Sequence, residues 1–435
     1  MQSKLTNGDV LMITGGQPLE GTVKAIGNKN AALPMIAAAL LTEERVDFSN
    51  VPDIKDVRTM LEIAEGLGVS VDWRREAGTL TMNSGALRSS KVPKELCSSL
   101  RAGVLFAAPL LVRTGAADMP PPGGDVIGKR RLDSHFQGLT AMGAAIKAGK
   151  GFKFEAENGL TGADIFLPEA SVTATEQLML AAVLAEGETI ISNAAYEPHV
   201  SDLARLLVKM GADISGIDTK TLVIRGVEKL HGATHRVVSD HTEAGSLIAL
   251  AAATRGEITV TDIDPEHYRM TALVFERLGI QLEFGDDWMR VGREQERKIL
   301  PDFSGGIPTI DDGPWPHFPS DLMSVCIVLA TQMKGTALFF EKMYESRMYF
   351  VDRLIAMGAN AVVCDPHRVV VVGPAQLHGT ELVSPDIRAG IALLGAALCA
   401  KGTSLIRNVH LIDRGYEKIE QKLTALGANL ERLIV

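Results

Sequence analysis

At 435 residues the chain is too long for one ordinary hydrophobic core, so its length predicts two domains of about 200 residues each. Its net charge of −9, from 44 basic and 53 acidic residues, argues against a nucleic-acid or anionic-membrane partner. The four cysteines lie far apart without a C-x-x-C pair, which favours reduced thiols over a zinc site or a disulfide framework. The N-terminus has no signal-peptide pattern and no apolar run is long enough to span a bilayer, so the sequence predicts a soluble cytoplasmic protein.

One pattern recurs six times along the chain. In each copy an amphipathic helical segment ends in Leu-Gly or Met-Gly, and a strand-like segment of alternating polarity follows it. The copies occupy residues 61–73, 138–148, 203–217, 272–284, 351–363 and 419–433, with glycines at Gly68, Gly143, Gly211, Gly279, Gly358 and Gly427. Successive glycines are 75, 68, 68, 79 and 69 residues apart. Each glycine is predicted to end its helix in a left-handed conformation just before the strand begins.

A second pattern alternates with the first and consists of an Ala/Leu-rich helix, a short polar break and a strand. It occupies residues 35–51, 179–194, 247–263, 325–341 and 393–409, and residues 103–119 follow it less well. Helices this apolar on most faces are predicted to lie inside their domain. The two patterns together predict six β-α-β-α-β-β units, three in each domain. An open solenoid is the alternative for tandem repeats, but the period here is longer than that of the usual solenoids.

Polar or charged residues stand at the start of the first helix in every unit. They are Lys29-Asn30, Arg101, Ser171-Val172-Thr173, His241-Thr242-Glu243, Asp321 and Arg388. The repeat would place these six helix N-termini in equivalent positions, where free N–H groups and the positive dipole end favour anions. The alternative is that these residues are ordinary caps and solvated helix starts. Anion binding is favoured because all six open similarly apolar helices.

Residues 120–135 combine closely spaced prolines and glycines with the basic cluster Lys129-Arg130-Arg131. Such a composition predicts an exposed loop or flap. Its GG-x-x-x-G pattern is weak evidence for phosphate binding, and a solvated basic patch is the alternative for the three cations. Asp125 is more informative, because it places a potential proton donor four residues ahead of a potential phosphate clamp.

Seven segments, in order along the chain, carry a resemblance to a known family. They are IGNKNAALP, LRAG, PPGGDVIGKRRLD, ASVTATE, FPSD, PDIRAG and IDRGYEKIEQKLTALGA. In these segments the chain resembles the UDP-N-acetylglucosamine 1-carboxyvinyltransferases (enolpyruvyl transferases), and the likeness covers essentially the whole sequence. It implies the two-domain inside-out α/β barrel also found in 3-phosphoshikimate enolpyruvyl transferases (EPSP synthases), with six βαβαββ repeats, three per domain.

The resemblance also implies a domain organisation and an activity. Residues 29–238 would form a catalytic-loop domain and residues 1–28 and 239–435 the second domain, with a hinge near 28–29 and 238–240. The enolpyruvyl group of phosphoenolpyruvate would pass to the 3-hydroxyl of UDP-N-acetylglucosamine by addition–elimination in the cleft between the domains, releasing phosphate. This is the first committed step of peptidoglycan synthesis in the cell wall.

The partners expected are these two small-molecule substrates, without nucleic acid, membrane or cofactor. No metal is predicted either, because His231 and His235 lack a third ligand at a suitable spacing. The sequence predicts no particular oligomer.

Residue roles follow from the resemblance, position by position. Asp125 would supply a proton as general acid, Asp321 would be the base at the sugar 3-hydroxyl, and Lys29 would take part in catalysis. Phosphoenolpyruvate would be held by Lys29, Arg101, Arg130, Arg347, Arg388 and Arg414. The UDP-sugar would contact Asn30, Arg101, Arg131, Leu132, Asp133, Ser171, Val172, Thr173, Asp321 and Met343, with 131–133 bordering the uracil and 171–173 receiving the diphosphate.

Two positions depart from the family pattern in ways that carry predictions. Asp125 stands where the family most often has a cysteine, so the protein should be insensitive to the epoxide fosfomycin, which alkylates that thiol. Thr173 stands where the family usually has glycine, so a Cβ is expected where the backbone would approach the diphosphate.

The sequence disfavours two alternative functions. An enzyme acting on 3-phosphoshikimate is disfavoured because the glycine-rich GNAGTxMR signature of that family is absent around Arg101. A non-catalytic paralogue that binds a UDP-sugar is disfavoured because a binding protein needs neither the acid Asp125 nor the base Asp321.

Overall fold

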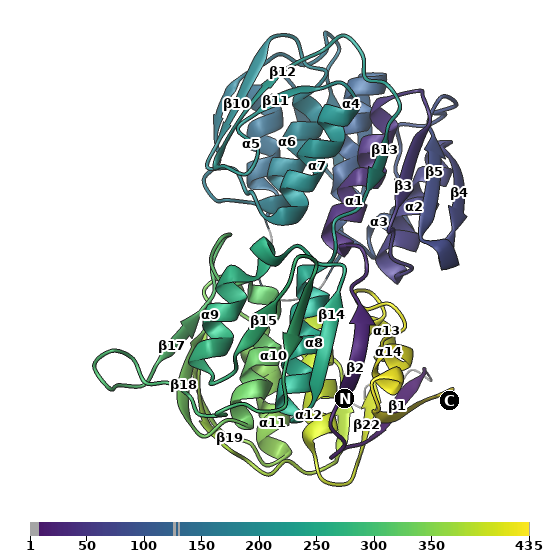
Figure 1. Cartoon of the computed structure of the whole chain (residues 1–435). Helices are drawn as coiled ribbons and strands as arrows, with labels where there is room; N and C mark the ends of the chain where they lie inside the picture. Colours follow the sequence, from purple (N-terminus) through teal and green to yellow (C-terminus); the bar gives the residue numbers. More distant parts are fainter. Residues whose placement is uncertain (1–7, 125–127, 129–130, 435) are drawn as a thin grey trace. The chain divides into compact units, whose positions relative to one another are not determined.

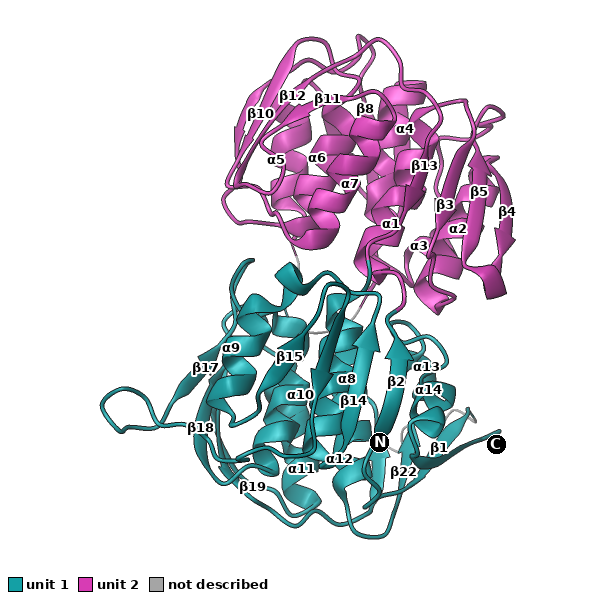
Figure 2. Cartoon of the chain, viewed as in Figure 1, with its two compact units in different colours: residues 1–25, 126–129, 239–435 teal, residues 26–125, 130–238 magenta. Residues whose placement is uncertain are grey.

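The computed structural model describes residues 8–124, 128 and 131–434. These residues divide into two compact units, which Figure 2 colours separately. Unit 2 contains residues 26–124 and 131–238, and unit 1 contains residues 8–25, 128 and 239–434. Within this part of the chain, no helix has the length and apolar character that a bilayer crossing requires.

Unit 2 is built from three successive repeats of helices and strands (Figure 1). The first contains α1 (Lys29–Ala38), η1 (Ala39–Leu41), β3 (Val46–Ser49), α2 (Lys55–Leu67), β4 (Ser70–Arg74), η2 (Arg75–Ala77) and β5 (Thr79–Asn83), and is joined by β13 (Thr234–Arg236). The second contains α3 (Lys94–Cys97), η3 (Arg101–Phe106), α4 (Ala107–Thr114), β6 (Ala116–Met119), α5 (Asp133–Ala141), β7 (Ala145–Ala148) and β8 (Phe152–Glu155). The third contains β9 (Asp164–Phe166), α6 (Val172–Ala182), β10 (Glu188–Ser192), α7 (Pro198–Lys209), β11 (Asp213–Ser215) and β12 (Thr221–Arg225).

Unit 1 repeats the same order of elements and draws two strands from the start of the chain. Its first repeat contains β2 (Glu20–Lys24), α8 (His241–Ala253), β14 (Glu257–Thr261), η4 (Pro265–Tyr268), α9 (Arg269–Arg277), β15 (Leu282–Phe284) and β16 (Trp288–Val291). The second contains β17 (Thr309–Asp311), α10 (Ser320–Thr331), β18 (Gly335–Phe340), η5 (Arg347–Phe350), α11 (Val351–Ala356), β19 (Asn360–Asp365) and β20 (Arg368–Gly373). The third contains β21 (Glu381–Val383), α12 (Ile387–Cys399), β22 (Thr403–Arg407), α13 (Val409–Ile412), α14 (Ile419–Ala425), β23 (Asn429–Leu433) and β1 (Val10–Thr14).

The sheets share one topology, which shows that the repeats are structural equivalents. Five sheets have four strands, with a parallel pair at one edge and two antiparallel pairs after it, as in β9-β10-β12-β11. The sheet β6-β8-β7 has three strands among the described residues, and a single parallel bridge between Lys91 and Asp118 takes the place of the missing edge strand. This is the repeat whose sequence, residues 103–119, follows the pattern least well.

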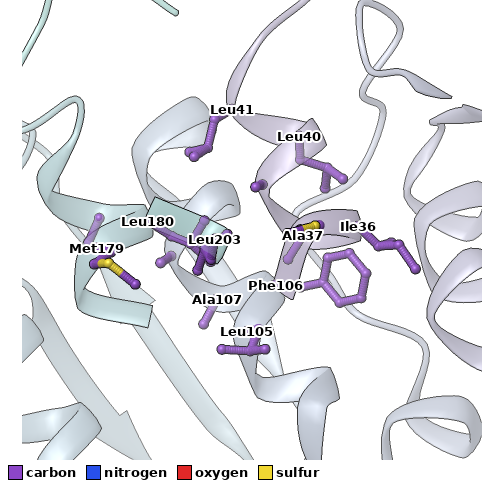
Figure 3. Packing of buried hydrophobic residues seen from close by; sticks show 14 of the residues in the cluster. Ile36, Ala37, Leu40, Leu41, Leu105, Phe106, Ala107, Met179, Leu180 and Leu203 are labelled. Atoms are coloured by element: carbon purple, nitrogen blue, oxygen red, sulfur yellow. The ribbon is translucent and has the colours of Figure 1, made fainter. Parts of the chain in front are cut away.

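The Ala/Leu-rich helices form the core of each unit, as their composition predicts. In unit 1, α8, α10 and α12 pack against one another, and every residue of α8 is buried. In unit 2 the equivalent elements are α1, η3 with α4, and α6, and Figure 3 shows Ile36, Phe106 and Leu180 from these elements within that core. The amphipathic helices and the sheets surround these inner helices, which is an inside-out arrangement of an α/β fold.

The repeat containing Arg101 departs from the expected helix start. Arg101 opens the 3₁₀ helix η3 and not an α-helix, and the α-helical turns of α4 begin only at Ala107. Gly103 lowers helix propensity within this segment, and Pro109 cannot donate the backbone hydrogen bond that would continue an α-helix back to Leu105. The other five inner helices begin at or within one residue of the predicted positions.

The six repeat glycines confirm the predicted helix endings. All six have positive φ, from 78° at Gly279 to 105° at Gly358, and each follows the outer helix of its repeat. At Gly68 the space is also restricted, because an added Cβ would lie 2.7 Å from the carbonyl oxygen of Ala86. Only glycine fits this position without strain.

Replacing Gly68 with alanine should therefore destabilise unit 2. The left-handed backbone costs about 1–2 kcal/mol for an L-residue, and the contact with Ala86 adds to that cost. Gly149 is the matched control, because it has no positive φ and nothing lies within 4 Å of its added Cβ. Urea unfolding followed by tryptophan fluorescence should show a lower midpoint for Gly68→Ala and an unchanged midpoint for Gly149→Ala. Equal midpoints for the two variants would contradict this account.

Candidate functional site

Lys29 lies at the start of α1 in a buried ion pair. The Asn28 side chain caps the helix by accepting a hydrogen bond from the Ala31 N–H at 3.1 Å. Lys29 Nζ lies 2.7 Å from Asp56 Oδ2, and their side chains are only 10% and 5% exposed. Asp56 comes from the first turn of α2, a helix that the sequence predicted without suggesting this pair. The ion pair fixes the ammonium group at the N-terminal end of an inner helix.

A pocket of about 450 Å³ in unit 2 gathers several of the predicted sugar-nucleotide residues. It is lined by Arg101, Pro121, Pro122, Arg131, Leu132, Asp133, Phe136 and Phe152. Arg101 donates a hydrogen bond to the carbonyl of Arg131 at 2.8 Å, which joins η3 to the segment before α5. The rings of Phe136 and Phe152 lie 4.8 Å apart at an interplanar angle of 54°. The pocket thus combines two guanidinium groups, a carboxylate and an apolar aromatic wall.

The predicted diphosphate segment forms the start of α6. Ser171 is the N-cap, and its Oγ accepts a hydrogen bond from the Ala174 N–H at 3.4 Å. The hydroxyl of Thr173 lies 3.1 Å from Nε2 of His135, and Nδ1 of His135 contacts Gln177 Oε1. Burial lowers the pKa of His135 to about 4, so the imidazole is neutral at physiological pH. The side chain of Thr173 therefore has a partner that sequence reasoning missed.

Asp321 is the centre of the polar cluster in unit 1. Its Oδ1 lies 2.6 Å from Arg347 Nη2, and its Oδ2 lies 2.7 Å from Arg388 Nη2. Asp321 stands in the first turn of α10, Arg388 in the first turn of α12, and Arg347 at the start of η5. The cluster forms because α10 and α12 pack side by side with these ends adjacent. The side chain of Asp321 is 25% exposed, whereas those of the two arginines are 11% and 9% exposed.

The two arginines determine the charge state of Asp321. Burial alone would raise the pKa of Asp321, but the positive charges of Arg388 and Arg347 and their hydrogen bonds outweigh that effect and hold the pKa well below its usual range. A carboxylate held in this way is ionised at every physiological pH. It is also a weak base while both arginines remain bound to it.

Tyr416, to which the sequence analysis assigns no role, extends this cluster. Arg388 Nη1 donates a hydrogen bond to the Tyr416 hydroxyl at 3.1 Å, and that hydroxyl lies 2.9 Å from Ser246 Oγ of α8. Tyr416 thereby joins the C-terminal segment to two inner helices. The predicted residue Arg414 is half-buried in the turn two residues earlier. Met343, also predicted, is 39% exposed, and its N–H donates to Glu341 Oε1 at 3.1 Å.

The predicted site residues fall into two groups. Unit 2 holds Lys29, Asn30, Arg101, Arg131, Leu132, Asp133, Ser171, Val172 and Thr173, and unit 1 holds Asp321, Met343, Arg347, Arg388 and Arg414. Asp125 and Arg130 lie outside the described residues. Among the residues that are described, no group of three or more His, Cys, Asp or Glu side chains is arranged to hold a metal ion. His235 instead pairs with Asp202 at 2.9 Å.

Comparison with known proteins identifies relatives along the whole chain. A family model described as EPSP synthase (3-phosphoshikimate 1-carboxyvinyltransferase) matches residues 13–423. The UDP-N-acetylglucosamine 1-carboxyvinyltransferase of Treponema denticola is 52% identical over 420 residues, which cover 97% of this chain and 98% of the relative. The protein of the same name from Bradyrhizobium diazoefficiens is 50% identical over 422 residues, covering 97% of each chain.

Solved structures confirm the fold. The enolpyruvyl transferase NikO from Streptomyces tendae has a TM-score of 0.87 at 24% identity, covering 99% of this chain and 100% of its own. An EPSP synthase from Acinetobacter baumannii has a TM-score of 0.73 at 17% identity, covering 98% and 100%. The predicted two-domain inside-out α/β barrel is therefore confirmed. The chain belongs to the family of enolpyruvyl transferases that the EPSP synthase model describes, and within it to the UDP-N-acetylglucosamine 1-carboxyvinyltransferases.

Proposed function

We propose that this protein transfers the enolpyruvyl group of phosphoenolpyruvate to the 3-hydroxyl of UDP-N-acetylglucosamine and releases inorganic phosphate. The observation that carries the proposal is the pairing of Asp321 with Arg347 and Arg388, in a chain whose relatives at half identity are named for this reaction. The cluster contains a carboxylate that can act as a base and two guanidinium groups suited to a phosphate and a carboxylate. The reaction would take place in the cytoplasm as the first committed step of peptidoglycan synthesis.

The addition step needs a base at the sugar and a proton for the vinyl carbon. We assign the first role to Asp321, which would take the proton of the 3-hydroxyl as that oxygen attacks C2 of phosphoenolpyruvate. Asp125 would deliver a proton to the CH₂ carbon, which becomes a methyl group in the tetrahedral adduct. Elimination would then return a proton from that methyl group to Asp125, re-form the double bond and expel phosphate, which takes the proton held by Asp321, so that atoms and charge balance.

Substrate binding would switch the basicity of Asp321. With the arginines on Asp321, its pKa lies well below the usual range and it cannot take a proton effectively. Phosphoenolpyruvate carries three negative charges at most and would compete with Asp321 for Arg347 and Arg388. When the guanidinium groups turn to the substrate, the pKa of Asp321 should rise towards its normal value. The base would thus become active only when the electrophile is bound.

The sugar nucleotide would use the unit 2 residues. We assign the uracil to the pocket bordered by Arg131, Leu132 and Asp133, and the diphosphate to the start of α6 at Ser171–Thr173. The helix N-terminus supplies N–H donors and a favourable dipole for the diphosphate. Since the Thr173 hydroxyl bonds to His135, its side chain has a fixed partner, and Thr173 would contact the diphosphate through its backbone N–H group.

Lys29, Arg101, Arg130 and Arg414 would complete the binding of phosphoenolpyruvate. We also retain the proposed hinge near 28–29 and 238–240. The division of the chain into compact units changes at residues 25–26 and 238–239, which supports a double crossing at this place.

Phosphate release from defined mixtures tests the proposal. Phosphoenolpyruvate is incubated with UDP-N-acetylglucosamine, with 3-phosphoshikimate, or alone, and phosphate is measured against time. We expect phosphate only in the first mixture. Release of phosphate with 3-phosphoshikimate would instead favour a 3-phosphoshikimate enolpyruvyl transferase. If no mixture releases phosphate but the protein still binds UDP-N-acetylglucosamine, it would be a non-catalytic UDP-sugar-binding protein.

A further inference from the structure

Glu341 has a fully buried carboxyl group and contacts residues adjacent to both Asp321 and Arg347. It follows the last residue of β18, and its side chain is 0% exposed. Its Oε2 accepts a hydrogen bond from Ser320 Oγ at 2.8 Å, and its Oε1 accepts from the N–H groups of Met343 and Tyr344, each at 3.1 Å. None of these contacts was predicted from the sequence, where Glu341 only ends a strand.

These contacts tie Glu341 to both members of the ion pair. Ser320 is the first residue of α10 and directly precedes Asp321. Tyr344 lies in the turn that leads to Arg347, and the Arg347 guanidinium carbon lies 4.7 Å from the centre of the Tyr344 ring. One carboxyl group therefore holds the start of α10 and the turn before η5 at a fixed separation. That separation determines how Arg347 meets Asp321.

A second buried carboxyl group, that of Asp312, lies against Glu341. Asp312 is 1% exposed and follows β17 directly. Its Oδ1 accepts a hydrogen bond from the Lys342 N–H at 2.6 Å. Its Oδ2 is buried and accepts no hydrogen bond from any described group. β17 and β18 pair in parallel with Asp311 opposite Phe340, so the next residues, Asp312 and Glu341, are neighbours. Two buried carboxylates placed in this way cannot both be ionised at low cost.

Burial and the neighbouring carboxyl group keep a proton on Glu341 near neutrality. Burial, followed by the hydrogen bond with Asp312, raises the pKa of Glu341 to about 8, and Arg347 opposes the rise. The other charged groups nearby have partners of their own. Lys342 pairs with Asp311, and the His367 ring contacts the carbonyl oxygen of Glu341 at 2.7 Å and not its carboxyl group.

We propose that Glu341 is a positioning residue for enolpyruvyl transfer, and that it works as a carboxyl pair with Asp312 that holds one shared proton. With the proton in place, the carboxyl pair keeps Asp321 and Arg347 at the separation that their ion pair requires. Loss of the proton leaves two negative charges side by side, which would push apart β17, β18 and the turn at 343–344. The part of the proposal that concerns catalysis rests on the proposed function, whereas the shared proton does not.

The sign of the pH effect follows from the raised pKa. Below about pH 8 the pair keeps its proton and the site is assembled, and above that pH the proton is lost. If the doubly ionised pair is inactive, kcat at about pH 9.5 should be about 30-fold below its plateau. Glu341→Gln should keep kcat within about threefold at neutral pH, because the amide can donate to Asp312 and accept from the same groups. It should also remove the alkaline loss of activity.

The experiment measures kcat against pH for the wild type and three variants, Glu341→Gln, Asp312→Asn and Glu341→Ala. Asp312→Asn should also remove the alkaline loss, because Glu341 then ionises beside a neutral amide. Glu341→Ala should lower kcat by about 10- to 100-fold at all pH values, with thermal melting as the check on folding. Glu176→Gln is the matched control. Glu176 is 1% exposed, and burial and the charge of Glu197 raise its pKa well above the ordinary value. It belongs to unit 2, whereas Glu341 belongs to unit 1. That variant should keep the alkaline loss.

Infrared spectroscopy of the same proteins observes the proton without using activity. The wild type should show a carboxylic-acid band that disappears as the pH rises through about 8, and Glu341→Gln should lack this band. The band of Glu176, whose pKa is also raised, should be common to both proteins and missing only from Glu176→Gln. If the wild type releases no phosphate with UDP-N-acetylglucosamine, the proposed function fails while the pH-dependent band still decides whether the proton is shared. An unchanged alkaline loss in Glu341→Gln, or the same pH-dependent band in Glu341→Gln as in the wild type, would overturn the proposal. If Glu341→Ala does not fold, the two amide variants decide.

Discussion

Asp321→Asn is expected to lower kcat by a hundredfold or more without weakening phosphoenolpyruvate binding. The amide cannot take the proton of the sugar hydroxyl, so the addition step loses its base. The amide also releases Arg347 and Arg388 from the ion pairs that they make with Asp321. Phosphoenolpyruvate then no longer competes with a carboxylate for these arginines. Its dissociation constant should stay the same or fall.

Steady-state kinetics and calorimetric titration with phosphoenolpyruvate measure the two effects separately. Asp365→Asn is a suitable control, because Asp365 is also an arginine-paired carboxylate of unit 1, with Arg368 Nη2 at 2.6 Å and a side chain 29% exposed. It should leave kcat and binding unchanged. Near-normal turnover of Asp321→Asn would remove Asp321 from the mechanism. Loss of binding with unchanged kcat would give it a binding role alone.

Substitutions of Asp125 should have the second largest effects. Asp125→Asn keeps the shape of the side chain but has no proton to donate, so activity should fall by about 100- to 10,000-fold. Asp125→Cys should stay active, because a thiol and a carboxylic acid can both donate a proton. It should also become sensitive to fosfomycin, because a thiolate is a far better nucleophile than a protonated carboxyl group.

The wild type should resist this epoxide. Burial raises the pKa of the Cys97 thiol to about 12, and burial raises that of Cys399 to about 12 as well. Cys326 is fully buried in α10, and Cys364 is exposed on β19 of unit 1. Residual activity and intact mass are measured after incubation of all three proteins with fosfomycin, and peptide mapping separates a Cys364 adduct from one at position 125. A wild-type adduct at Asp125, or full activity of Asp125→Asn, would show that Asp125 has another role.

The repeat could be predicted from the sequence because its signals are local. Gly68 and its five equivalents each end a helix, and the residues that predict this ending lie next to the glycine in the sequence. Each of the six glycines has the expected positive φ. The inner helices were recognisable from their composition, since a helix such as α8 that is apolar on most faces has to be buried. The start of the second repeat was less predictable, because Gly103 and Pro109 weaken α-helix formation around Arg101.

The partners of the site residues could not be predicted in the same way. Asp56, His135 and Tyr416 meet Lys29, Thr173 and Arg388 through packing between elements that lie 27 to 38 residues apart in sequence. No periodic sequence pattern predicts such a pairing. From the sequence alone, a buried acidic residue cannot be distinguished from one that ends a strand or caps a helix. The neighbouring carboxyl groups of Glu341 and Asp312 are of the same kind, since each residue stands just after the end of a strand and nothing in the sequence relates the two.

Identification of the reaction product tests the central claim most directly. The protein is incubated with phosphoenolpyruvate labelled with ¹³C at C2 and with UDP-N-acetylglucosamine, and the product is examined by NMR and mass spectrometry. We predict one enolpyruvyl ether per phosphate released, with the labelled carbon bonded to the oxygen at C3 of the sugar and the vinyl CH₂ retained. Release of phosphate with free pyruvate and no ether, or an ether formed only with 3-phosphoshikimate, would contradict the assignment.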